Sequence, residues 1–104
     1  MPVFRSVAFQ IRPEGLERCR GAIEEFVNSI RGTQPGTQIY VSLQSKQDLT
    51  QFLHVMVFAD ERAEQLHREA PSTAKFTAIL SPELQPPASS PDFDPYEVVA
   101  GTPL

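Results

Sequence analysis

Residues 52–76, FLHVMVFADERAEQLHREAPSTAKF, join an apolar strand directly to a short helix. Both faces of the strand at 52–59 are largely apolar, and a strand of this kind must be covered on both faces. Asp60 stands where it would cap the helix that follows. One face of this helix is formed, at i, i+3, i+4 and i+7, by Ala63, Leu66, His67 and Ala70. The spacing predicts that His67 faces the sheet.

The rest of the chain continues this alternation of strands and helices. Period-two alternation predicts a strand at 3–11, and the spacing of apolar residues from Leu16 to Ile30 predicts a helix of about four turns. The remaining expected elements are strands at 37–45 and 52–59, helices at 60–70 and from 71 onward, and a strand at 96–100. This β-α-β-β-α-β order predicts an α+β, ferredoxin-like fold, an antiparallel four-stranded sheet with helices on one face.

Length and composition favour one domain over residues 1–104, with a proline-rich extended connector at 82–95 and a frayed tail at 101–104. No apolar run approaches ~20 residues, so no membrane span is expected. The start, MPVFRSVAF, lacks the pattern of a secretory signal, which makes a cytoplasmic protein the expectation. The single cysteine, Cys19, excludes an internal disulfide, and the net charge of −4 argues against a nucleic-acid partner.

The second face of the predicted sheet carries too much apolar surface for water. It would include Phe4, Ala8 and Tyr40, together with one of the two rows of the strand at 52–59. Monomers rarely expose apolar patches above a few hundred Å². We therefore expect a homodimer in which the two sheets pack face to face.

The order of strand, Asp-Glu turn, helix ending in His67, and Pro71 resembles the antibiotic biosynthesis monooxygenase family of small dimeric α+β barrels. The helix that closes at Pro35-Gly36 ahead of the second strand agrees with this resemblance. Members keep a small cavity between sheet and helices, and several oxidise quinols or phenolic polyketides with O2 and no cofactor. The resemblance implies a cofactor-independent monooxygenase that binds a small aromatic ligand.

His67 is the candidate catalytic residue, because an imidazole with a pKa of ~6.5 can accept a proton near neutral pH. Alternatively, it would bind a backbone carbonyl at the end of its helix. The candidate substrate-binding residues are Phe9, Phe26, Tyr40, Phe58 and Phe76, with core packing as the alternative for most of the phenylalanines and an interface or core role for Tyr40. His54 is interpreted as a cross-strand or dimer-interface partner. Because His54 and His67 lack a third ligand, no metal is expected.

Three positions depart from the pattern of the family. Met56 stands where members often carry an acidic residue, Ser72 where many carry a second histidine, and Phe58 where a tryptophan is common. A non-catalytic ligand-binding or accessory dimer on the same fold is therefore the main alternative. A haem-binding or haem-degrading relative is less favoured, since the chain has no tryptophan and its first strand no asparagine.

Overall fold

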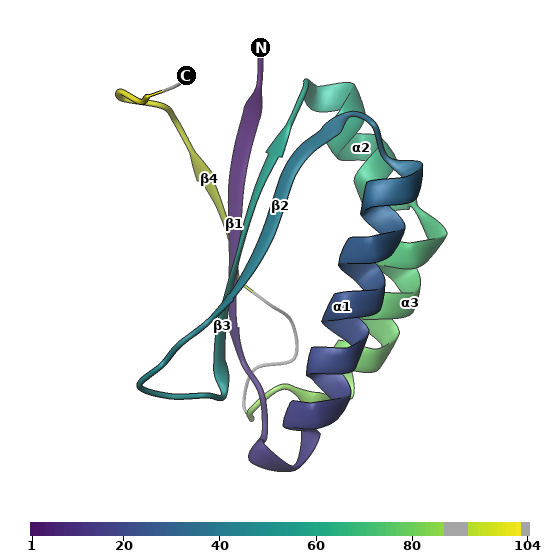
Figure 1. Cartoon of the computed structure of the whole chain (residues 1–104), viewed down its shortest axis with the longest axis vertical. Coiled ribbons are helices and arrows are strands. Elements are labelled where there is room, and N and C mark those ends of the chain that lie inside the picture. Colours follow the sequence, from purple (N-terminus) through teal and green to yellow (C-terminus); the bar gives the residue numbers. More distant parts are fainter. Residues whose placement is uncertain (87–91, 103–104) are drawn as a thin grey trace.

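The computed structural model describes residues 1–86 and 92–102. One antiparallel sheet is covered on one face by helices, and the strands lie in the order β2-β3-β1-β4 (Figure 1). The elements are β1 (Val3–Gln10), α1 (Leu16–Thr33), β2 (Thr37–Gln44), β3 (Gln51–Phe58), α2 (Glu61–Glu69), α3 (Pro71–Leu80) and β4 (Asp92–Tyr96), with short 3-10 turns at Pro13–Gly15 and Ser81–Glu83. The predicted ferredoxin-like α+β fold is confirmed.

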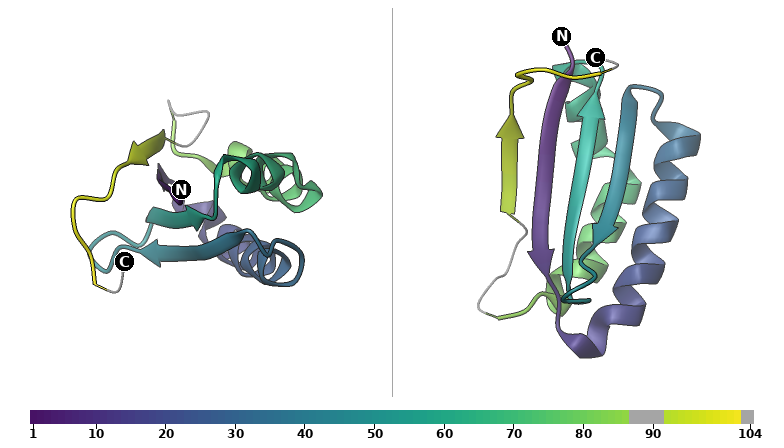
Figure 2. Two further views of the ribbon diagram at one scale, coloured as in Figure 1. Left: turned by 90° about the horizontal axis from the view of Figure 1, so that it is seen from above. Right: turned by 60° about the vertical axis from the view of Figure 1, so that its left-hand side comes forward.

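The helices all lie on the same side of the sheet (Figure 2). The face of α1 that packs against the strands is formed by Cys19, Ala22, Ile23, Phe26 and Ile30. α1 and α3 run side by side over the sheet (Figure 1). α2 is the short helix that leads from the end of β3 into α3. No helix among the described residues is long and apolar enough to cross a bilayer.

The last strand lies earlier in the chain than the sequence predicts. β4 covers Asp92–Tyr96 and pairs antiparallel with β1, so it shares only Tyr96 with the expected strand at 96–100. The proline of this strand, Pro95, is compatible with the position of β4 at the edge of the sheet, because edge strands tolerate proline where central strands do not. Ser81–Glu83 and a bridge between Ile11 and Leu84 occupy the start of the expected connector, and residues 87–91 of that connector lie outside the described residues.

β3 is the central strand that decides which side chains face the helices. Its inner row, buried at 1–6% exposure, is Phe52, His54, Met56 and Phe58. On β2 the inner row contains Tyr40 and Ser42, which pair with Met56 and His54. The prediction that placed Tyr40 on the outer face was therefore wrong. An irregularity in the pairing between Thr37 and Ile39 precedes this part of β2.

The face that α2 turns to the sheet also differs from the prediction. Asp60 caps the helix as expected, its Oδ1 accepting from the Ala63 N–H at 2.8 Å. The buried residues of α2 are Ala63, Glu64 and His67, whereas Leu66 is 50% exposed. Glu64 turns inward because it is held by arginines, so the inner stripe contains a charged residue that the apolar pattern did not indicate.

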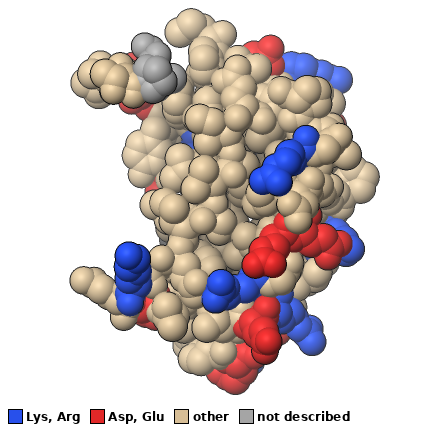
Figure 3. All heavy atoms as spheres, in the orientation of Figure 1, with Lys and Arg blue, Asp and Glu red and all other residues tan. Residues whose placement is uncertain are grey.

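The outer face of the sheet carries a continuous apolar surface. Its exposed large side chains are Ile39, Val41, Leu43, Leu53 and Tyr96, each between 39% and 59% exposed. The charged side chains in Figure 3 gather mainly over the helices, while the strand side is largely uncharged. Exposing such an apolar surface to water is unfavourable, and monomers rarely do so. The expected sheet-to-sheet homodimer stays a prediction, and the structure now identifies the row that would face the partner.

Val41→Glu tests this prediction. Val41 is 43% exposed in the single chain, so a glutamate there is compatible with the fold of one subunit. In a sheet-to-sheet dimer the same carboxylate would be buried without a partner, at a cost of roughly 3–5 kcal/mol. Light scattering after gel filtration at micromolar concentration should give about twice 11.6 kDa for the wild type and a monomer for the variant.

Gln47→Glu, which adds the same charge in the exposed hairpin between β2 and β3, serves as the control and should remain dimeric. A wild-type monomer under these conditions would contradict the prediction.

Candidate ligand cavity

A cavity of about 460 Å³ lies between the sheet and the helices. All six residues singled out from the sequence line it, namely Phe9, Phe26, Tyr40, Phe58, His67 and Phe76. They come from β1, α1, β2, β3, α2 and α3, so each layer of the fold supplies a part of the wall. A volume of this size falls within the range of small-molecule sites.

The phenylalanines form an aromatic wall with defined ring contacts. Phe26 stacks on Phe76 with ring centroids 4.6 Å apart and meets the edge of Tyr40 at 5.4 Å. Phe9 stacks on Phe52 at 5.4 Å. These rings belong to the hydrophobic core as well as to the cavity. Substrate binding and core packing, the two alternatives for these residues, are therefore compatible, because the same rings pack in the core and line the cavity.

His67 is held in one orientation by the turn that follows α1. Its Nδ1 lies 2.8 Å from Oε1 of Gln34, an oxygen that also accepts from the Thr37 hydroxyl at 3.0 Å. A carboxamide oxygen can only accept, so Nδ1 carries the proton and Nε2 keeps its lone pair. The turn approaches α2 closely at Gly36, where a Cβ would lie 2.7 Å from that of Ala63. Glycine at this position thus lets Gln34 reach the imidazole.

The charge state of His67 differs from the one expected from its type. Burial lowers the pKa of His67 to about 4, while the Glu64 carboxylate raises it and the Arg68 guanidinium lowers it. At neutral pH the imidazole is neutral, with Nε2 unprotonated. The ~6.5 assumed from the sequence does not hold in this environment, because desolvation disfavours the imidazolium.

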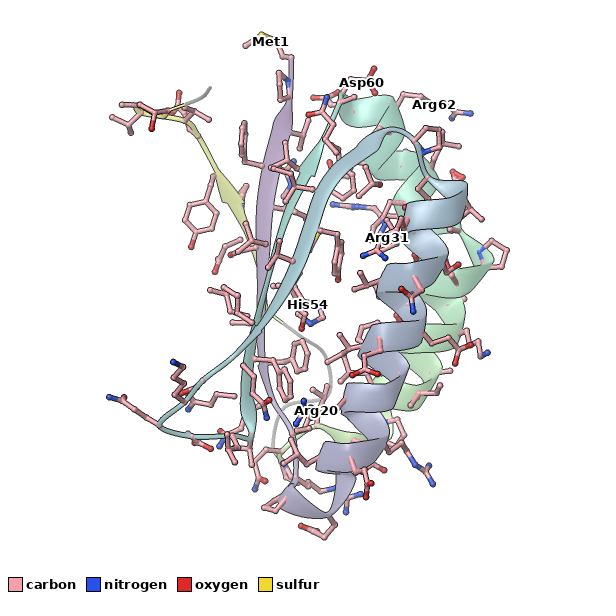
Figure 4. All side chains as sticks on the ribbon, viewed as in Figure 1. Met1, Arg20, Arg31, His54, Asp60 and Arg62 are labelled. Carbon is pink, nitrogen blue, oxygen red and sulfur yellow. The ribbon has the colours of Figure 1, made fainter. Side chains whose placement is uncertain are left out.

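His54 belongs to the same cavity. It lies on the inner row of β3 and points from the sheet toward the helices (Figure 4). Its Nδ1 is 2.7 Å from the hydroxyl of Tyr40 on the neighbouring strand, and burial lowers its pKa to about 4. The cross-strand interpretation is confirmed, and the dimer-interface interpretation is wrong because the side chain faces inward. The sequence signal that could have predicted this position is the alternation along the strand, which puts His54 on the same face as Phe52 and Phe58.

A salt-bridge cluster at the wall of the cavity was missed by the sequence analysis. Arg5 of β1 contacts both carboxylate oxygens of Glu64, at 2.9 and 3.3 Å, and Arg68 contacts Oε2 at 3.1 Å. Two guanidinium groups share one carboxylate, so this wall carries a net positive charge. The sequence offered a signal for Arg5, which alternates in phase with Val7 and Phe9, whereas the apolar pattern of α2 did not indicate Glu64.

The positions that depart from the family pattern fall in different places. Met56 lines the cavity beside the aromatic wall. Ser72 does not line the cavity but lies at two surface grooves, one between α1 and α3 and one between the turn after α1 and α2. Within residues 1–86 and 92–102, no group of three or more His, Cys, Asp or Glu side chains is arranged to hold a metal ion.

Residues 2–78 match the family model described as antibiotic biosynthesis monooxygenase. The chain belongs to this family. The match covers the first three strands, α1, α2 and most of α3, and therefore every cavity residue named above. A comparison with curated protein sequences found no match.

Solved structures of the same fold agree with this membership. A candidate antibiotic biosynthesis monooxygenase from Bacteroides thetaiotaomicron has a TM-score of 0.86 and 18% identity, over 95% of this chain and 90% of that one. A protein from Mycobacterium tuberculosis has a TM-score of 0.84 and 17% identity, over 97% and 98%. A further candidate monooxygenase of the family, from Caulobacter crescentus, has a TM-score of 0.84 and 14% identity, over 95% and 91%. At these identities the similarity shows a shared fold.

Gln34→Glu should raise the pKa of His67. The substituted carboxylate would still accept from Nδ1–H, and its negative charge would favour the imidazolium over the neutral ring. An NMR titration of the His67 ring protons should place the midpoint above about 4, the wild-type value. Gln38→Glu adds the same charge at an exposed position and should leave the midpoint unchanged. An equal or lower midpoint in Gln34→Glu would show that Gln34 does not contact the imidazole.

The two buried histidines should make the fold sensitive to acid. Their pKa values are about 4 in the folded chain, against ~6.5 when unfolded, so below ~6.5 the unfolded chain binds protons that the folded chain does not. The free energy of unfolding should therefore be highest above about pH 6.5 and should fall as the pH approaches 4. Each histidine contributes roughly 2 kcal/mol of this loss between pH 6.5 and 5.

Urea unfolding at pH 7 and pH 5, at one protein concentration, measures this loss. His67→Gln should lose roughly 2 kcal/mol less than the wild type between the two pH values, because one titrating group is gone. Equal losses in both proteins would mean that His67 is not kept neutral by the fold.

Proposed function

We propose that this protein is a cofactor-independent monooxygenase that oxidises a small aromatic quinol or phenol with O2. The observation that carries the proposal is the unprotonated Nε2 of His67 in a cavity walled by aromatic rings. The cavity offers a flat apolar space for an aromatic ring, and His67 offers a proton acceptor at its wall. Family membership supports the same class of reaction.

The protein's share of the reaction is to bind the substrate and remove a proton. Nε2 of His67 takes the hydroxyl proton, and the resulting phenolate is electron-rich enough to transfer an electron to O2. Recombination of the two radicals forms a C–O bond. For a hydroquinone, one oxygen atom enters the product, a hydroxyquinone, and the other leaves as water. The four electrons that O2 accepts come from the substrate, so no further reductant is consumed.

A histidine with a pKa of about 4 is fully available at neutral pH but is a weak base. Proton transfer from a phenol to such a base requires stabilisation of the ion pair that forms. The Arg5 and Arg68 guanidinium groups lie at the same wall and would stabilise a phenolate. The carboxylate between them, Glu64, would stabilise the imidazolium. Charges aligned before the reaction in a low-dielectric site are the most effective form of such stabilisation.

We further propose that the protein acts as a sheet-to-sheet homodimer in the cytoplasm. The apolar outer face of the sheet supports the dimer, because exposing a large apolar surface to water is unfavourable.

A second candidate function is a non-catalytic ligand-binding or accessory dimer. Met56 supports it, because this residue lines the cavity where family members often carry an acid. In that case the cavity would bind the same class of aromatic ligand and release it unchanged. Oxygen consumption separates the two functions.

His67→Ala tests the catalytic role. The wild type should accelerate O2 uptake by hydroquinones or anthrone-like phenols without added metal or flavin, and the variant should be slower by roughly 10²-fold or more if the imidazole is the general base. The wild-type rate at saturating substrate should stay level as the pH falls to about 5 and drop toward pH 4, because protonation removes the lone pair of Nε2.

Leu66→Ala, an exposed position on the same helix, is the matched control and should retain the wild-type rate. Binding without O2 uptake across the substrate panel would favour the non-catalytic dimer. A small change in rate with a large loss of stability would assign His67 to the structure.

A further inference from the structure

His54 carries a polar atom that the protein itself does not satisfy. The side chain is 1% exposed, and its Nε2 is buried without a hydrogen-bond partner. Its other nitrogen, Nδ1, is occupied by the hydroxyl of Tyr40 at 2.7 Å. Buried polar atoms in native proteins are almost always paired, and an exception indicates a ligand, a water or a functional role.

The Tyr40 hydroxyl decides which nitrogen of His54 carries the proton. Burial raises the pKa of Tyr40, so the phenol keeps its proton. Nδ1 of His54 is the only hydrogen-bond partner of this hydroxyl among the described residues. If Nδ1 carried the proton, both the Tyr40 O–H and Nε2 of His54 would lack a partner, whereas an O–H that donates to Nδ1 leaves only Nε2 unpaired. We therefore assign the O–H as the donor and Nδ1 as the acceptor. A neutral imidazole has one donor and one acceptor nitrogen. Nε2 of His54 is therefore an N–H donor without an acceptor.

The protein groups around the ring cannot supply that acceptor. Phe9 meets His54 edge to face at 5.0 Å, and Phe76 stacks beside it at 6.0 Å. Leaving a buried donor unsatisfied costs roughly 1–3 kcal/mol. A ligand in the cavity that brings an oxygen to this position would recover that free energy.

We propose that Nε2–H of His54 is a second binding group of the cavity and donates a hydrogen bond to an oxygen of the aromatic ligand. This inference rests on the proposed function, in which a hydroxyl of the same ligand faces Nε2 of His67. The two imidazoles flank Tyr40, with ring centroids 5.4 and 5.6 Å from that of the phenol. One of them offers an acceptor and the other a donor.

The arrangement selects a class of substrate. A ligand that satisfies both groups carries one acidic hydroxyl and, elsewhere on its ring system, a second oxygen with a free lone pair. Quinols, hydroxyaryl ketones and alkoxyphenols meet this requirement, whereas simple alkylphenols do not. A site built to hydrogen-bond a polar group rejects an analogue that lacks it, because its own polar atom then stays unpaired.

Two ligands of nearly equal shape test the proposal, 4-methoxyphenol and 4-ethylphenol, which differ by an ether oxygen in place of a methylene. Binding is measured by calorimetry under argon, so that no turnover occurs. The wild type should bind 4-methoxyphenol at least roughly tenfold more tightly than 4-ethylphenol. In His54→Leu the two affinities should become equal, and His54→Gln, which retains an N–H donor, should keep part of the preference.

NMR of the wild type gives a readout that does not depend on a folded variant. The ¹⁵N shifts of His54 should show a proton on Nε2, and its resonance should move on addition of 4-methoxyphenol but not of 4-ethylphenol. An unprotonated Nε2, or the same ligand preference in wild type and His54→Leu, would overturn the inference.

The outcomes separate this inference from the proposed function. If both ligands bind without preference, the role of His54 fails while an aromatic-binding cavity remains. Preferential binding of 4-methoxyphenol without O2 uptake by any quinol would overturn the oxygenase and keep the role of His54. If neither ligand binds, the role of His54 is overturned, and O2 uptake with quinols decides the proposed function separately.

Discussion

The structure depends on the pairing of β3 with strands on both of its sides. β1 and β2 fix the register of β3, and the register fixes the row that faces the helices. Because side chains alternate along a strand, a shift of one residue would turn His54 and Met56 outward and place Leu53 and Val55 inside. The cavity and the apolar outer face are thus two consequences of one register.

The interior combines apolar walls with polar groups that each have a partner, although Nε2 of Gln34 and Nε2 of His54 are buried without one among the described residues. Gln34 holds His67, Tyr40 holds His54, and the arginines hold Glu64. His67, His54 and the Arg5–Glu64–Arg68 cluster all line the cavity. Burial keeps both imidazoles neutral, so their chemistry is set by which nitrogen carries the proton. This arrangement suits a ligand that is apolar in its ring and polar at two points.

Desolvation has opposite effects on the two tasks that the proposed reaction asks of His67. It keeps the imidazole unprotonated at neutral pH, and it weakens the imidazole as a base. The Arg5–Glu64 pair is largely removed from water, with side chains 26% and 11% exposed, so its field in the cavity is screened less than that of Arg68, which is 62% exposed. In the proposed reaction, this pair would stabilise the charges that proton transfer creates. A cavity without this salt-bridge cluster could still bind an aromatic ring, but it would stabilise the phenolate less.

The sequence by itself determined the features that depend on local periodicity and capping. These are the order of strands and helices, the cap at Asp60, the inward position of His67, and the phenylalanines at the cavity. Local patterns decide them because helix and strand periods repeat within a few residues. The same local features were also sufficient to predict the family to which the chain belongs.

Only the tertiary structure decided which face of β2 lies inside. Its apolar row, Ile39, Val41 and Leu43, had the composition of a core row, yet it faces outward and Tyr40 faces inward. Composition could not settle this, because an apolar row can face a helix or a partner chain equally well. The hydrogen bond from Tyr40 to His54, the salt bridges of Glu64 and the place of β4 likewise depend on contacts between residues far apart in the sequence. Such contacts are set by how the elements pack together, and no local pattern encodes them.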